Sequence, residues 1–261
     1  MSSDGQGLVQ STSRGMVFRS TGVGRPIVLV HGWCLDGRTW LYQEEALAHG
    51  AQTIVPDLPG FGASAGLAGP FTLDRYTDDL QTLLEEFDVA NATVVGFAFG
   101  ALVALAAAGR SGDRIGGVVA IGVPSASTAP YDRMPKAMRR DWPEFARRSA
   151  RAICKYPPSE ATLDWLAEIY GATRLPVALA VLEILGSTEP GDVIESVNVP
   201  TLFIHGADDD IVPVAVSQTC AARMADATVE IVEQSGHLVP LDQPGRVSEL
   251  VQAFAARGTG H

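Results

Sequence analysis

The apolar residues of this chain fall into short continuous runs separated by stretches of helical spacing. The run at 26–30 (Pro-Ile-Val-Leu-Val) is apolar throughout, which is typical of a strand buried on both faces of a parallel sheet. A shorter run at 16–19 precedes it and predicts another strand. Further strands are predicted at 52–56, 92–95, 115–121, 201–205 and 228–232.

The stretches between these runs predict helices. From residue 73 to 87 apolar side chains recur every three or four positions, which predicts an amphipathic helix. Other helices are predicted at 39–49, 101–108, 214–224 and 243–257. Strands that alternate with helices form parallel sheets with right-handed crossovers. The pattern therefore predicts an α/β fold with a mostly parallel central sheet flanked by helices.

The alternation stops between residues 124 and 198, where the pattern predicts helices and no strand. Asp141 and Glu144 have the spacing of a capping box at the start of one of these helices. We interpret 124–198 as a helical lid inserted into a core domain made of 1–123 and 199–261. Four basic residues of the lid, at 147, 148, 151 and 155, lie opposite an apolar helix face, so we expect them to form a solvated outer surface. The pattern does not decide the role of the four basic residues between 133 and 140.

The turn between the strand at 92–95 and the helix at 101–108 holds Gly96, Ala98 and Gly100. A strand, a tight Gly-x-x-x-Gly turn and a helix form the setting of a nucleophile elbow, in which the central residue is held out at the top of the sheet. The glycines allow the backbones to approach closely. The central residue is Ala98, where nucleophilic catalysis needs a hydroxyl group, and a methyl group cannot attack a carbonyl.

The amino-acid composition, net charge and cysteine positions exclude several classes of function. The chain has 261 residues, is 46% hydrophobic and carries a formal net charge of −11, which opposes binding to nucleic acids and to anionic membrane surfaces. Cys34, Cys154 and Cys220 lie far apart and match neither a metal spacing nor a disulfide framework. Residues 1–15 lack the apolar segment of a signal peptide. We therefore expect a cytoplasmic protein.

Several motifs together resemble the α/β-hydrolase fold superfamily, in its lid-bearing form. They are His31-Gly32-Trp33, the loop 57–62 with Ser64, the turn 96–100, and a late aspartate and histidine. The catalytic order of this superfamily is Ser, then Asp or Glu, then His. The resemblance places these roles at Ala98, Asp209 and His237, with Asp208 and Asp210 as alternatives for the acid.

The resemblance also implies an oxyanion hole and a substrate pocket. The hole needs two backbone N–H groups, which the resemblance assigns to Trp33 and Phe99. A lid above the elbow has to roof the pocket, and pockets for small ligands are mostly apolar. The predicted substrate-binding residues are Trp33, Phe97, Trp142, Phe145 and Trp165.

The motifs favour a serine hydrolase acting on a carboxylic ester or lactone of a mainly hydrophobic small molecule. Acid, base and hole are all predicted while only the nucleophile is absent, so we interpret Ala98 as a Ser→Ala exchange that inactivates the enzyme. We expect no metal and no organic cofactor. The expected partner is a small-molecule substrate, and a homodimer is compatible with the sequence.

Three alternatives stay open. The same fold and triad support hydrolysis of a carbon–carbon bond. Residues 33–38 are similar to the corresponding segment of cofactor-free dioxygenases, but Leu35 stands where a histidine is expected. The third alternative is a non-catalytic α/β-hydrolase homologue that only binds a ligand.

Overall fold

The computed structural model describes residues 7–110, 112–127, 131–156 and 159–257. Eight strands form one sheet in the order β1-β2-β4-β3-β5-β6-β7-β8. The pairs β1–β2 and β2–β4 are antiparallel and the other pairs are parallel, which confirms the predicted mostly parallel sheet. The strands are β1 (Leu8–Ser11), β2 (Val17–Thr21), β3 (Arg25–Val30), β4 (Ala51–Pro56), β5 (Ala92–Phe97), β6 (Ile115–Ile121), β7 (Thr201–Gly206) and β8 (Ala227–Val232).

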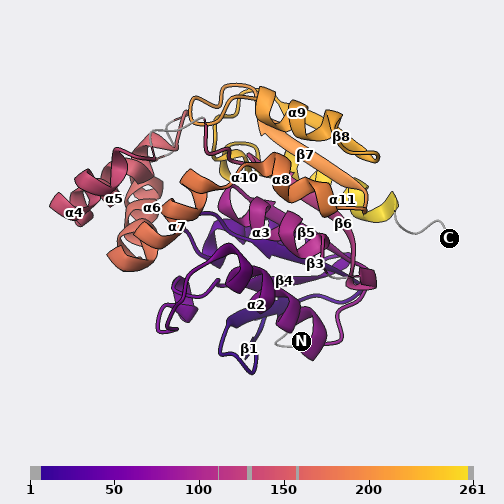
Figure 1. Cartoon of the computed structure of the whole chain (residues 1–261). Helices are drawn as coiled ribbons and strands as arrows, with labels where there is room; N and C mark the ends of the chain where they lie inside the picture. Colours follow the sequence, from indigo (N-terminus) through magenta and orange to yellow (C-terminus); the bar gives the residue numbers. More distant parts are fainter. Residues whose placement is uncertain (1–6, 111, 128–130, 157–158, 258–261) are drawn as a thin grey trace.

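Helices cover both faces of the sheet (Figure 1). One face carries α1 (Leu41–Leu47), α10 (Val239–Asp242) and α11 (Pro244–Arg257). The other carries α2 (Leu73–Glu86), α3 (Phe99–Ala108), α8 (Pro190–Val193) and α9 (Ala215–Ala222). Short 3-10 turns lie at Gly37–Trp40, Gly62–Ser64, Gly112–Arg114 and Ile194–Ser196.

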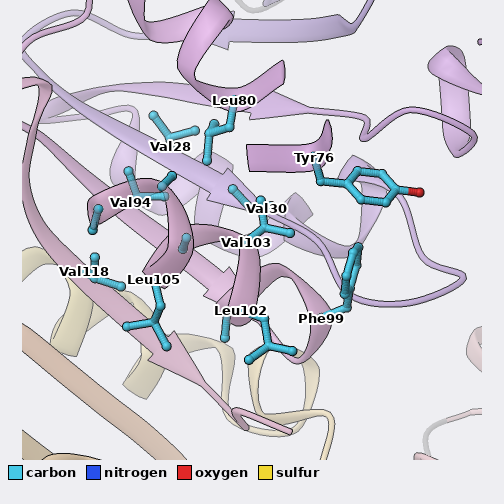
Figure 2. Close-up of a cluster of buried hydrophobic side chains, with 14 of the residues drawn as sticks. Val28, Val30, Tyr76, Leu80, Val94, Phe99, Leu102, Val103, Leu105 and Val118 are labelled. Atoms are coloured by element: carbon cyan, nitrogen blue, oxygen red, sulfur yellow. The ribbon is translucent and has the colours of Figure 1, made fainter. Parts of the chain in front are cut away.

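Burial on both faces explains the continuous apolar runs. All six residues of β5 are buried, and neighbouring side chains point to opposite faces, so Val94 and Val95 belong to different core clusters. Figure 2 shows the cluster on the α3 side, where helix and strand side chains meet. The labelled strand and α3 members are Val28, Val30, Val94, Val118, Phe99, Leu102, Val103 and Leu105.

Between β6 and β7 the chain forms a group of helices that stands beside the sheet, at the left of Figure 1. Its main members are α4 (Met134–Arg140), α5 (Trp142–Ala152), α6 (Glu160–Ala172) and α7 (Leu175–Ser187). The Asp141 side chain caps α5 by accepting a hydrogen bond from the Glu144 amide at 3.1 Å. Within this predicted insertion, residues 128–130 and 157–158 lie outside the described part of the chain.

The two most apolar helices of this group are α6 and α7. Their buried side chains pack into the core clusters, with Leu166 of α6 and Leu182 of α7 among them. No single described helix is long and apolar enough to cross a membrane. Only α6 and α7 taken together meet that length and composition, and the pair is bent by 93°.

The strand β1 was not expected from the sequence. It pairs antiparallel with β2 at the edge of the sheet, with Leu8 opposite Ser20. The Leu8 and Val9 side chains are 64% and 63% exposed, so they contribute little to the core. A short edge strand inside a polar, Gly- and Ser-rich segment leaves no hydrophobic pattern to recognise.

We expect Gly100→Ala to lower the free energy of unfolding by about 1–3 kcal/mol, because the added methyl group would overpack the contact between α3 and β3. A Cβ at Gly100 would collide with the backbone carbonyl groups of Val30 and His31. Urea denaturation measures the change. The matched control is Gly171→Ala in α6, where a Cβ meets nothing within 4 Å. Equal losses in both variants would contradict this account of the turn.

Candidate active site

Ala98 lies at the sharp turn between β5 and α3, and its backbone is strained. Its φ is 48° and its ψ is −113°, values that cost an L-residue about 1–3 kcal/mol. The amide of Ala98 donates to the carbonyl of Ile121 at 2.8 Å, which ties the turn to β6. A Cβ on Gly96 would collide with the Gly100 backbone, so the turn needs glycine there. The surrounding sheet thus holds the residue at position 98 in a conformation typical of a nucleophile elbow.

His237 and Asp209 lie in the loops that follow β8 and β7. Asp209 Oδ2 is 2.8 Å from His237 Nδ1. The other oxygen, Oδ1, accepts the amides of Ile211 at 2.8 Å and Val212 at 2.9 Å. The carboxylate is therefore fixed from one side by its own loop, and its second oxygen faces the His237 imidazole.

The neighbouring carboxylates point elsewhere. Asp208 accepts a hydrogen bond from the Tyr156 hydroxyl, and Asp210 pairs with the Lys155 ammonium group. Both partners lie in the connection between α5 and α6. Of the three candidate acids, the structure brings Asp209 to His237.

The electrostatics of Asp209 suit a carboxylate that stays ionised. Burial by itself raises the pKa of Asp209, but hydrogen bonds from His205 and His237 outweigh it and hold that pKa well below its usual value. An ionised Asp209 keeps the proton of the neutral imidazole on Nδ1. The Nε2 atom of His237 is then free to accept a proton.

His205 is a part of the site whose contact with Asp209 sequence reasoning did not foresee. It closes β7 and is fully buried, with Nε2 2.9 Å from the Val212 carbonyl and 3.2 Å from Asp209 Oδ2. Its Nδ1 is 2.7 Å from the Ser217 hydroxyl. Its spacing of four residues from Asp209 was the only signal for the contact.

Trp33 and Phe99, whose backbone N–H groups are predicted to form the oxyanion hole, line the same cavity as Ala98. In the described residues, neither the Trp33 nor the Phe99 amide donates to a protein acceptor. The loop that carries Trp33 is braced by His31, whose Nε2 accepts the Leu58 amide at 3.0 Å and whose Nδ1 lies 2.9 Å from the Gly32 carbonyl. Burial lowers the pKa of His31, which keeps it neutral in this bracing role.

A cavity of about 190 Å³ lies between the carboxyl ends of the strands and the α4–α7 group. Its lining is mostly apolar, and no described lining residue is Lys, Arg, Asp or Glu. The lining includes Trp33, Phe97, Ala98, Ile153, Tyr170 and His237. The Phe97 and His237 rings are 5.3 Å apart between centroids, so the imidazole forms part of the wall.

The cavity includes two of the five predicted substrate-binding residues, Trp33 and Phe97. Trp142 and Phe145 are not among its lining residues, and their rings stack on each other with centroids 6.0 Å apart. The Trp142 indole N–H also donates to the Thr173 carbonyl at 2.8 Å. These two rings hold helices together and do not face the cavity.

Trp165 also lies away from this cavity. It lines a separate hollow of about 460 Å³ that Tyr42 of α1 and Leu241 of α10 also border. The roof of the first cavity comes from other residues of the helical group. They include Met134, Ile153, Tyr170 and Leu185, none of which is among the five predicted substrate-binding residues.

The described residues contain no group of three or more His, Cys, Asp or Glu side chains that could hold a metal ion. All three cysteines are free thiols. Burial raises the pKa of Cys34 well above its usual value, so this thiol beside Trp33 stays protonated. The chemistry that this arrangement can support is proton transfer at His237 beside two backbone N–H donors.

Comparison with known proteins places these features in a family. A pimeloyl-[acyl-carrier protein] methyl ester esterase from Aromatoleum aromaticum is 28% identical, with 88% of this chain and 98% of that protein aligned. A non-heme chloroperoxidase, CPO-A1, from Kitasatospora aureofaciens is 25% identical, with 87% and 90% aligned. The structure of an esterase from Exiguobacterium antarcticum superposes with a TM-score of 0.88, covering 96% of this chain and 99% of that one.

At 19% identity, the esterase structure shows a shared fold. The sequence also matches the model of the alpha/beta hydrolase family over residues 27–250, which is most of its length. The strand order, the strained turn at Ala98 and the positions of Asp209 and His237 agree with that match. The chain therefore belongs to the alpha/beta hydrolase family.

Proposed function

We propose that this chain has the site of a serine hydrolase for carboxylic esters or lactones of small, mainly hydrophobic molecules, inactivated by alanine at position 98. The observation that carries the proposal is the 2.8 Å contact between His237 and Asp209 beside a strained turn centred on Ala98. The mostly apolar cavity at this point supports a hydrophobic substrate.

The mechanism follows from these positions once Ala98 is replaced by serine. His237 Nε2 would take the proton of the introduced hydroxyl as its oxygen attacks the substrate carbonyl, and Asp209 would stabilise the imidazolium that forms. The Trp33 and Phe99 amides would hold the developing oxyanion. Protonation of the leaving alcohol by His237 would give an acyl-enzyme, and water activated by His237 would release the acid.

In the chain as it stands the substrate is bound and stays intact. In an unrelated protease, loss of the nucleophile lowers kcat by about 2 × 10⁶. The helical group from α4 to α7 acts in this proposal as a lid, since it forms the roof of the cavity. The net charge of −11 supports a small-molecule partner over a nucleic acid, and the free thiols support a cytoplasmic location.

A second candidate is a ligand-binding protein without catalytic activity, which Ala98 itself favours. Measurements of ligand binding and of catalytic turnover distinguish the two candidate functions. Both candidates bind small carbonyl compounds, but only the hydrolase gains turnover of aryl esters or lactones when Ala98 is replaced by serine. A variant that binds such esters and never releases their alcohol would favour the second candidate.

A further inference from the structure

One tyrosine of the cavity wall, Tyr170 of α6, is almost fully buried. The side chain is 3% exposed and lines the cavity. Within the part of the chain that the structure describes, its hydroxyl makes no hydrogen bond. The Trp33 indole in the same wall donates to the Ala178 carbonyl at 3.0 Å, and the buried Tyr76 hydroxyl donates to the Pro59 carbonyl at 3.2 Å.

A hydroxyl of the cavity wall that makes no hydrogen bond to the described protein can donate one to a ligand in the cavity, which supplies the acceptor. Burial raises the pKa of Tyr170 well above its usual value, so the hydroxyl keeps its proton and can donate. The Tyr170 ring lies edge-on to the Trp33 ring, with centroids 6.0 Å apart. Trp33 and Tyr170 are therefore neighbours in the cavity wall, and one molecule in the cavity can contact both residues.

The side chains that line the cavity limit the charge of the ligand. Among the described residues, no Lys, Arg, Asp or Glu lines the cavity, so a buried anion would lack a permanent counter-charge. The basic side chains of α5 are exposed and already paired on the outer surface. Arg147 and Arg148 pair with Glu144, and Arg151 pairs with Glu160.

The size of the ligand follows from the volume. A dry apolar cavity of about 150 Å³ holds a benzene molecule. By that measure the 190 Å³ cavity holds about eight non-hydrogen atoms of a ligand.

We propose that this cavity selects compact, uncharged carbonyl compounds of about eight non-hydrogen atoms that carry a second oxygen atom. In this proposal the Tyr170 hydroxyl donates a hydrogen bond to the second oxygen and so determines specificity for it. The inference rests on the proposed function only for the place of the first carbonyl, at the Trp33 and Phe99 amides. It goes further by naming the ligand class and the residue that selects it.

Three ligands with the same branched shape and the same number of non-hydrogen atoms test the proposal. Hexane-2,5-dione has a second carbonyl oxygen, 5-methylhexan-2-one has a methyl group in its place, and 4-oxopentanoate has a carboxylate at that end. Their dissociation constants are measured with the unchanged chain by calorimetry or ligand-observed NMR. We expect the dione to bind about three- to tenfold more tightly than the monoketone, and the anion to bind most weakly.

Tyr170→Phe should remove the preference for the dione and leave the monoketone affinity within about twofold, since only one hydrogen bond is lost. The control is Tyr42→Phe, a tyrosine that is 47% exposed on α1 and should change nothing. Thermal unfolding of each variant verifies that it is folded.

The proposal is overturned if Tyr170→Phe weakens both ketones equally or leaves the preference intact, because Tyr170 then acts only in packing or not at all. Binding of 4-oxopentanoate as tight as that of the dione, or no binding of any of the three ligands, also overturns it. If the ligands rank as expected while Ala98→Ser hydrolyses no ester, the hydrolase proposal fails and this inference stands.

Discussion

The Ala98→Ser variant is expected to hydrolyse short aryl esters and lactones that the unchanged chain leaves intact. The strained turn already places position 98 in the cavity wall, and His237 is held there by Asp209. Since only the attacking atom is missing, its return should raise kcat by roughly 10⁴- to 10⁶-fold over the chain as it stands. Initial rates of alcohol release from a panel of esters and lactones measure the gain.

A matched control places a serine elsewhere in the same cavity. Ala152 of α5 lines the cavity but lies away from the elbow, so Ala152→Ser should give no activity. The gain from Ala98→Ser should disappear when His237→Ala is added. Equal rates for the two serine variants would show that the turn has no special role.

The second large effect concerns Asp209. In the Ala98→Ser background, Asp209→Asn is expected to lower kcat by about 10⁴-fold, because an amide can favour the wrong tautomer of His237 and cannot stabilise its positive charge. Steady-state kinetics with the best ester or lactone measure the loss. KM should change far less than kcat, since Asp209 is not among the residues that line the cavity.

Asp210→Asn is the matched control for this prediction. Asp210 is the next residue along the same loop, but its side chain is exposed and pairs with Lys155. Its replacement should leave kcat within a few-fold of the parent. If Asp210→Asn costs more than Asp209→Asn, the assignment of the acid to Asp209 is refuted.

The strands and the elbow could be predicted because their signals are local. A strand buried on both faces, such as β6, must be apolar at every position. The continuous apolar sequence of such a strand ends where the chain turns. The β1 strand gave no such signal, because it lies at the sheet edge with Leu8 and Val9 exposed.

The cavity wall was harder to predict. Helical spacing shows that Trp142 and Phe145 share an apolar face, but it does not show whether that face meets a cavity or another helix. In the structure the two rings meet each other, while Tyr170 reaches the cavity. Which side chains roof the cavity depends on how distant helices pack, and one sequence does not encode that packing as a local pattern.

The contact of His205 with Asp209 was hidden for a related reason. A histidine at a strand end satisfies its hydrogen bonds in many ways, and the sequence does not show which partners it meets. The structure shows that it shares Asp209 Oδ2 with His237 and also binds the Val212 carbonyl. The acid of the pair is therefore held by three elements: its own loop, β7 and the loop after β8.

In the proposed mechanism this site lacks only its nucleophile. The most direct test is to treat Ala98→Ser with methanesulfonyl fluoride, a reagent small enough for the cavity that sulfonylates activated serines with loss of fluoride, and to measure the intact mass and the labelled peptide. We expect a single methanesulfonyl adduct at position 98, no adduct on the unchanged chain, and almost none when His237→Ala is added. A folded Ala98→Ser variant that stays unlabelled would contradict the proposed mechanism.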